Sequence, residues 1–222
     1  GDVARIEACG VHEFPRASEP EPSEADFHPA AAATTVEWKC EGRIVEWTVP
    51  PGVTQATIEA WGASGGDATD KGGKGGRGAH LRGVFALVPG QRLRLLVGGA
   101  APATERSSGG GGGSFVVGAD GSPLLVAGGG GGASLYEPRD GLAAALGEGG
   151  VKGQDRKRSS QKGHAGGAGG GGGAADGSHG GGVSGGGLRG DGAEHADKSS
   201  SCGGAGCSFA AGGAGGAAGP YP

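Results

Sequence analysis

The sequence predicts a mainly β protein in which a β-sandwich is attached to a bundle of extended glycine helices. Short stretches of alternating apolar and polar residues recur from residue 34 to about residue 127, which is typical of strands. Glycine accounts for 58 of the 222 residues, so the large apolar side chains suffice for one modest core. The glycines come in blocks, and some blocks repeat every three residues, the period of a polyproline II type helix.

Residues 1–33 are predicted to form a strand followed by a tether. Apolar residues alternate with Arg5 and Glu7 near the start, which is the period of a half-buried strand. From Pro15 to Ala33 the chain is acidic and rich in proline, as extended surface linkers are. The apolar residues of the candidate assembly strand are Val3, Ala4, Ile6 and Ala8.

The predicted sandwich spans about residues 34–127. Two alternating stretches, 34–40 and 43–49, contain Trp38 and Trp47 and are expected to pair as a hairpin. Further strands are expected within 54–61, 78–88 and 91–97, and two short strands around the Asp120–Gly121 turn. In the stretch 91–97, Leu93, Leu95 and Val97 are expected on one face, and Arg92 and Arg94 on the other.

The glycine helices are predicted mainly over 128–219, with additions at 62–78 and 109–113. Their backbone N–H and C=O groups need partners, so the helices are expected to bond laterally to one another. Flexible linkers are the alternative interpretation of this composition. The ordered bundle is favoured because the blocks recur between strands. In residues 72–77 the period of three places Lys74 and Arg77 on one edge.

Three segments follow one another as WTVPPGVTQATIEAWGASGG, GGKGGRGAHLRGVFALVPGQRLRLLVGG and GGGGGSFVVGADGSPLLVAGGGGGAS. In this order they resemble the glycine-rich domain of bacterial surface proteins and of the anaplastic lymphoma kinase and leukocyte tyrosine kinase receptor ectodomains. The resemblance covers residues 44 to about 187. It implies a jelly-roll sandwich similar to tumour necrosis factor, from which long loops leave to form a bundle of polyglycine helices.

In that family the chain returns from the glycine helices to add a final strand to the sandwich. This sequence instead ends with Gly219, Pro220, Tyr221 and Pro222, and proline does not suit a central strand. A missing strand would leave an open edge. The strand within residues 3–14 is expected to fill it, either by donation to a neighbouring subunit or by folding back within its own chain. Donation would link subunits head to tail into a fibre.

Composition and cysteine content predict an extracellular or cell-surface protein. The net charge of −4 argues against nucleic acid as a partner, and no apolar run approaches the ~20 residues of a membrane span. The absence of Met indicates a processed product or an excised segment, as removal of a secretory signal would give. Four cysteines allow three disulfide pairings, of which Cys9–Cys40 and Cys202–Cys207 are favoured.

The sequence offers no candidate for catalysis, cofactor binding or metal binding, so an enzyme is not expected. Lys74 is followed by Gly75, where a phosphate loop needs Ser or Thr. A metal site from His195, Cys202 and Cys207 would lack a fourth ligand in register.

The expected function is a secreted structural subunit of a cell-surface fibre, sheath or appendage, which associates with identical subunits. The alternative is an extracellular binding module, such as an adhesin or receptor ectodomain segment, that contacts other surface proteins. Ice binding is disfavoured because charges such as Arg189 and Asp191 interrupt the regular rows of small residues that it needs.

Overall fold

The structure is a computed structural model that describes residues 3–10, 34–71, 73–105, 108–133, 186–192 and 206–216. Eight strands and one short 3-10 helix, η2 (Thr69–Lys71), are present in these ranges. The strands are β1 (Val3–Gly10), β2 (Thr34–Lys39), β3 (Val45–Thr48), β4 (Val53–Trp61), β5 (His80–Ala86), β6 (Arg92–Leu96), β7 (Ser114–Gly118) and β8 (Pro123–Ala127). The mainly β prediction is therefore confirmed.

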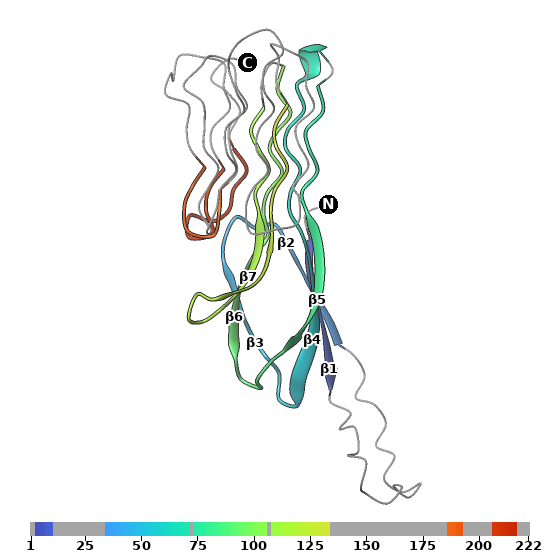
Figure 1. Cartoon of the computed structure of the whole chain (residues 1–222), viewed down its shortest axis with the longest axis vertical. Helices are drawn as coiled ribbons and strands as arrows, with labels where there is room; N and C mark the ends of the chain where they lie inside the picture. Colours follow the sequence, from blue (N-terminus) through green and yellow to red (C-terminus); the bar gives the residue numbers. More distant parts are fainter. Residues whose placement is uncertain are drawn as a thin grey trace, which may run out of the picture.

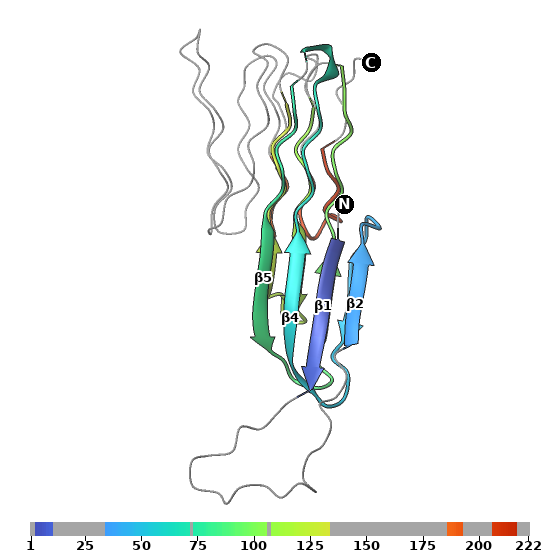
Figure 2. The ribbon, with the colours of Figure 1, turned by 90° about the vertical axis from the view of Figure 1, so that its right-hand side faces the viewer.

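The strands form two antiparallel four-stranded sheets. Sheet A has the order β2-β1-β4-β5, which Figure 2 shows face on, and sheet B has the order β3-β6-β7-β8. The chain crosses between the sheets at 40–44, 49–52 and 87–91. The β7–β8 hairpin turns through Asp120 and Gly121, and Gly121 has a positive φ of 81°. This hairpin was predicted from the Asp–Gly pair.

The hairpin predicted for residues 34–49 is wrong. β2 pairs with β1 in sheet A, whereas β3 pairs with β6 in sheet B. The connection between them includes Gly42, whose φ of 67° lies in the left-handed region. Trp38 and Trp47 meet edge to face, with ring centroids 6.0 Å apart and an interplanar angle of 74°. Facing each other from separate sheets, the two indoles pack against the core between the sheets.

β1 is an interior strand of sheet A. Its Ile6 is in register with Val36 of β2 on one side and with Ile58 of β4 on the other. Ala4, from the candidate assembly strand, is buried in the core. The strand therefore lies within its own chain, between two strands rather than at a sheet edge. Residues 11–14 of the predicted strand lie outside the described residues.

The core between the sheets combines small side chains from sheet A with large ones from sheet B. Ala4, Ala56 and Ala60 of sheet A, with Ile58, pack in one cluster with the larger side chains of sheet B. The sheet B members of this cluster include Leu93, Leu95, Val97, Val116 and Leu125. Leu93, Leu95 and Val97 share the inner side as predicted, while Arg92 is exposed on the other. Small residues in one layer thus accommodate large residues in the other.

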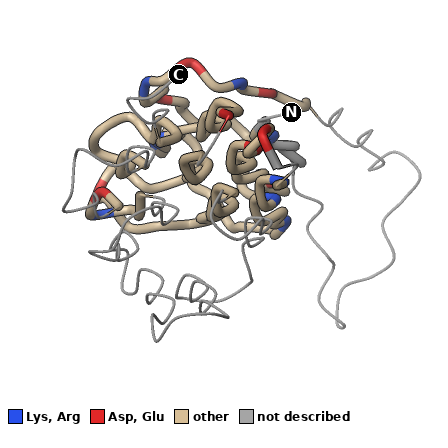
Figure 3. The backbone as a smooth tube through the Cα atoms, turned by 90° about the horizontal axis from the view of Figure 1, so that it is seen from above, with Lys and Arg blue, Asp and Glu red and all other residues tan. Residues whose placement is uncertain are grey.

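Beyond the sandwich, the chain extends from one end of both sheets. Figure 1 shows these extensions running side by side along the long axis, away from the end where the β3–β4 and β5–β6 connections lie. Seen along that axis in Figure 3, most of the charged residues lie around the outline of the described backbone. The extensions contain many of the glycine blocks that distinguish this sequence.

Candidate functional site

Five described segments continue the strands beyond the sandwich, and we call them the glycine array. Residues 62–68 follow β4 and residues 73–79 precede β5, so this pair extends a hairpin of sheet A. Residues 97–105 follow β6, residues 108–113 precede β7 and residues 128–133 follow β8, all from sheet B. The array therefore joins the two sheets beyond the sandwich.

Backbone amides at every third residue bond to the same neighbouring segment. The amides of Gly62, Gly65 and Ala68 donate to the carbonyls of Ala79, Gly76 and Gly73, at 2.8, 2.9 and 2.9 Å. In a β-strand the side chains and bonds alternate with a period of two. Because the array repeats every three residues, successive backbone amides and carbonyls point toward different neighbouring segments.

Segment 62–68 lies at the centre of the array, because it is bonded to all four of the others. Its bonds to 73–79 are those just described. The amides of Ala63 and Gly66 donate to Gly112 and Gly109 of segment 108–113, at 2.9 and 3.1 Å. The remaining two segments donate to it: the amides of Gly130 and Ala133 bond to the carbonyls of Ala63 and Gly66, and those of Ala101 and Thr104 to Ser64 and Asp67. Backbone groups thus do the packing that side chains do in the sandwich.

The segments approach so closely that some positions admit only glycine. A Cβ added at Gly65 would overlap the carbonyl oxygen of Gly131, and one at Gly78 would overlap that of Gly62. In the GGK GGR repeat of residues 72–77, residues larger than glycine occupy the position of each three-residue repeat that faces outward. Lys74 and Arg77, which were predicted to lie on one edge, are both exposed, while Gly76 between them is buried. The spacing of glycine and non-glycine residues therefore matches the packing.

A buried serine joins the sandwich to the array. Ser114, the first residue of β7, donates from its Oγ to the carbonyl of Trp61 at 2.7 Å. The same Oγ accepts the amide of Gly98 at 3.1 Å. Trp61 and Gly98 belong to the points where β4 and β6 pass into the array. One hydroxyl thus satisfies two backbone groups where the ladder changes from a period of two to a period of three.

Ser114→Ala should lower the free energy of unfolding by about 1–3 kcal/mol, because it leaves the Trp61 carbonyl and the Gly98 amide without this partner. Urea unfolding measures the change. The control is Ser64→Ala at an exposed position of the array, which should change stability by no more than about 0.5 kcal/mol. Equal effects of the two variants would contradict a joining role for Ser114.

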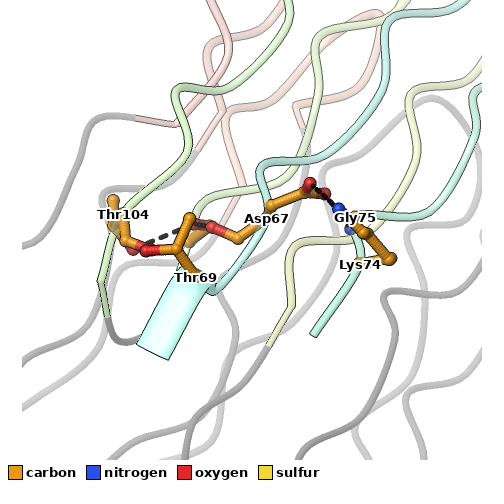
Figure 4. Close-up of polar contacts among 6 residues, drawn as sticks. Asp67, Thr69, Lys74, Gly75 and Thr104 are labelled. Atoms are coloured by element: carbon orange, nitrogen blue, oxygen red, sulfur yellow. Dashed lines mark hydrogen bonds and ion pairs between the residues drawn. The ribbon is translucent and has the colours of Figure 1, made fainter. Parts of the chain in front are cut away.

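At the far end of the array, Asp67 connects its own segment to three others, and Figure 4 shows it with Lys74, Gly75 and Thr104. Its Oδ2 accepts from Lys74 Nζ and its Oδ1 from the Gly75 amide, both at 2.8 Å. These two bonds, from the Lys74 side chain first and the Gly75 backbone second, lower the pKa of Asp67. Its backbone carbonyl accepts from Ser108 Oγ at 2.5 Å and from the Thr104 amide at 2.9 Å. The network is internally satisfied, so it closes the array.

The lowered pKa of Asp67 predicts an acid-dependent contribution to stability. A carboxylate with a lower pKa in the folded state stabilises the fold above its unfolded pKa of about 3.9, and this is lost as the pH falls through the folded value. Asp67→Asn should therefore be less stable than the native chain at pH about 6, and the difference should shrink below pH about 4. Asp70→Asn removes a charge from the same end and is the control. A difference for Asp67→Asn that is independent of pH would contradict the assignment.

A second apolar cluster lies on the outer face of sheet B. Phe209, from the glycine-rich C-terminal region, is buried there against Phe115, with ring centroids 5.5 Å apart. Arg94 lies over the Phe209 ring, with its guanidinium carbon 5.2 Å from the centroid. Leu96, Val117, Ile44 and Leu188 complete the cluster. This cluster was not predicted from the sequence, although Phe209 is a single large apolar residue in a run of small ones and so could have indicated it.

Phe209 is held by a C-terminal hairpin, residues 206–216. The Cys207 amide donates to Ala214 across it, and the turn contains Gly212 and Gly213 with φ of 92° and 61°. The amide of Gly216 donates to Gly110 at 3.0 Å, which attaches the hairpin to segment 108–113. Asp191 Oδ1 accepts the Ser208 amide at 2.6 Å, and this bond lowers the pKa of Asp191. The lateral bonding predicted between glycine segments is therefore present between Gly216 and Gly110.

The structure brings none of the predicted cysteine pairs together within the described residues. Cys40 is exposed and Cys207 is half-buried, and neither forms a disulfide with another described residue. The side chain of Cys9 and the whole of Cys202 lie outside the described residues, so both pairings stay predictions. His195 also lies outside them. Within the described ranges, no group of three or more potential ligands is placed to hold a metal ion.

No model of a protein family matches the chain, and a search of curated proteins found no match. In the described part of the chain, no helix is long and apolar enough to cross a membrane. The proposed function therefore rests on the geometry of the array and the sandwich.

Proposed function

We propose that this chain is a secreted structural subunit in which the glycine array acts as a stiff spacer at the cell surface. The observation that supports this most is the three-residue recurrence of backbone hydrogen bonds, which cross-links segments from both sheets. Segment 62–68 alone bonds to four neighbours. A rod bonded in several lateral directions resists bending more than a single hairpin does.

We further propose that the array segments are polyglycine helices of the polyproline II type, and that the sandwich is a jelly roll. The period of three supports the first part, because this helix has three residues per turn and makes no internal hydrogen bonds. The arrangement of eight strands in two four-stranded sheets supports the second. Both are the features implied by the resemblance to glycine-rich surface domains.

The described surface favours a structural role over capture of a protein ligand. Binding hot spots are rich in Trp, Tyr and Arg and lie in well-packed central pockets. In the described residues, the exposed large hydrophobic side chains are three valines on the sandwich: Val84, Val88 and Val126. The aromatic side chains Trp38, Trp47, Phe115 and Phe209 pack against the two cores instead.

Distances between spin labels test the spacer directly. The four native cysteines are changed to serine, and cysteines are introduced at Val88 and Asp70, which lie at opposite ends of the sandwich and array. Strand and threefold-helix rises give a separation on the order of 50 Å. A pair at Val88 and Lys39, within the sandwich, gives the reference width.

A stiff spacer predicts one narrow distance distribution for the long pair, as narrow as that of the reference pair. A distribution several times broader than the reference would mean that the extension behaves as a linker, and the spacer function would be abandoned.

A further inference from the structure

The connection between β1 and β2 is much longer than two adjacent antiparallel strands need. The two strands are antiparallel neighbours, and such neighbours are usually joined by about 2–5 residues. Here residues 11–33 separate them in the sequence. A fully extended chain of that length spans on the order of 70 Å. The connector is therefore long enough for β1 to reach beyond its own sandwich.

β1 fills a slot that only a strand can fill. It pairs with β2 from Val3↔Lys39 to Ala8↔Thr34, and with β4 from Ala4↔Ala60 onward. β2 is at the edge of sheet A and pairs with β1 alone among the described strands. Without β1, the facing edges of β2 and β4 would both expose unpaired N–H and C=O groups, which favours pairing with another strand.

The charges beside the slot match β1 in particular. In one row across sheet A, Glu37 of β2, Arg5 of β1 and Glu59 of β4 are register partners. Arg5 forms an ion pair with Glu37 at 3.1 Å. The row continues to Arg82 of β5, so its charges alternate in sign. Opposite charges directly across strands are favourable and like charges are not, so the row favours a strand with a cation at this position.

We propose that the slot between β2 and β4 accepts β1 from a second copy of this chain, so that subunits are linked through exchanged N-terminal strands. The inference rests on the proposed structural function and names the partner of that subunit. An exchanged β1 makes the same contacts as a β1 in its own chain. The protein concentration therefore decides which of the two arrangements is more populated. A connector of this length gives β1 an effective concentration on the order of 1 mM at its own slot. Linkage between chains should grow as the subunit concentration approaches that level.

Disulfide trapping in the full-length chain distinguishes the two placements of β1. The native cysteines are changed to serine, and Glu7→Cys is combined with Thr57→Cys, because these residues are register partners between β1 and β4. The matched control combines Thr57→Cys with Val84→Cys, which are register partners within the β4–β5 hairpin. Both variants are unfolded, refolded at about 10 μM and about 1 mM, and oxidised, so that the two concentrations lie on either side of the expected exchange.

Exchange predicts covalent dimers and larger species for the β1–β4 pair on a non-reducing gel, in a fraction that increases with concentration, and monomers for the control. The proposal would be overturned if both pairs gave only monomers at both concentrations. It would also be overturned if both pairs gave the same fraction of covalent oligomers. If the β1–β4 disulfide does not form, light scattering of the same sample decides: concentration-dependent oligomers support exchange and a monomer at about 1 mM refutes it. The spin-label distances can be measured on a monomer, so failure of exchange and failure of the spacer are distinguishable.

Discussion

Replacing Gly65 by alanine should lower the free energy of unfolding by about 3 kcal/mol, because the array leaves no room for the added methyl group. The new Cβ would overlap the carbonyl oxygen of Gly131, which is backbone and accepts a bond from the Gly76 amide. Relief of the overlap would separate segments that are held by hydrogen bonds. Urea unfolding monitored by circular dichroism gives the change.

Two controls separate close packing from other effects of the methyl group. Gly52→Ala has no neighbouring atom within 4 Å but a φ of 81°, so it should cost about 1 kcal/mol through backbone strain alone. Ala103→Val adds bulk at an exposed position of the array and should be almost neutral. If Gly65→Ala were no more destabilising than Gly52→Ala, the close contact between 62–68 and 128–133 would be wrong.

Phe209→Ala should detach the C-terminal hairpin from sheet B at a cost of about 3–5 kcal/mol, the range for removal of a buried phenylalanine ring. It removes the edge-to-face contact with Phe115 and the ring beneath Arg94. Hydrogen exchange followed by mass spectrometry should show faster exchange in 206–216. Leu96 and Val117 would become accessible, so binding of a hydrophobic dye should increase.

Phe209→Leu is the matched variant, because it keeps an apolar side chain and should cost less than about 1.5 kcal/mol. Faster exchange confined to 206–216 and its contacts is the expected pattern for Phe209→Ala. Unchanged exchange in that hairpin would show that Phe209 does not hold it on the sheet.

Alternation predicted most strands of the sandwich but not their partners. Leu93 and Leu95 alternate with arginines, and this pattern gave both the strand and its buried side. Trp38 and Trp47 also alternate correctly, yet their strands belong to different sheets. Alternation specifies the face of a strand and not its neighbour. The neighbour depends on the path of residues 40–44, which a local pattern does not contain.

The array was predicted only in part, because its packing, like the pairing of strands, depends on neighbouring segments that a local pattern does not contain. The GGK GGR repeat predicted that Lys74 and Arg77 lie on one edge, because glycine occupies the remaining positions of each period, and both residues are exposed. Segment 97–105 was not assigned to the array because Ala100, Pro102 and Ala103 interrupt its glycines. Those side chains are tolerated where they face outward, as Pro102 and Ala103 do. Which positions face outward depends on the neighbouring segments, so it is a property of the assembled array.

Much of the predicted glycine tract, including 134–185, lies outside the described residues, and its order stays a prediction. The part that is described shows how the tract is fixed to the sandwich. Phe209 packs on sheet B, and Gly216 bonds to Gly110 of the array. The hairpin 206–216 is thus attached at two points, by an apolar side chain on sheet B and by a backbone hydrogen bond to the array.

Amide hydrogen exchange by nuclear magnetic resonance tests most directly the claim that the glycine segments are held together by their backbones. The amides of Gly62, Gly65, Gly76 and Gly111 each donate to a neighbouring segment at 2.8 or 2.9 Å. They should exchange orders of magnitude more slowly than an unstructured glycine and at rates close to those of β4, because opening them requires the array to separate. Exchange of these four amides at the rate of an unstructured chain, while β4 stays protected, would contradict the account.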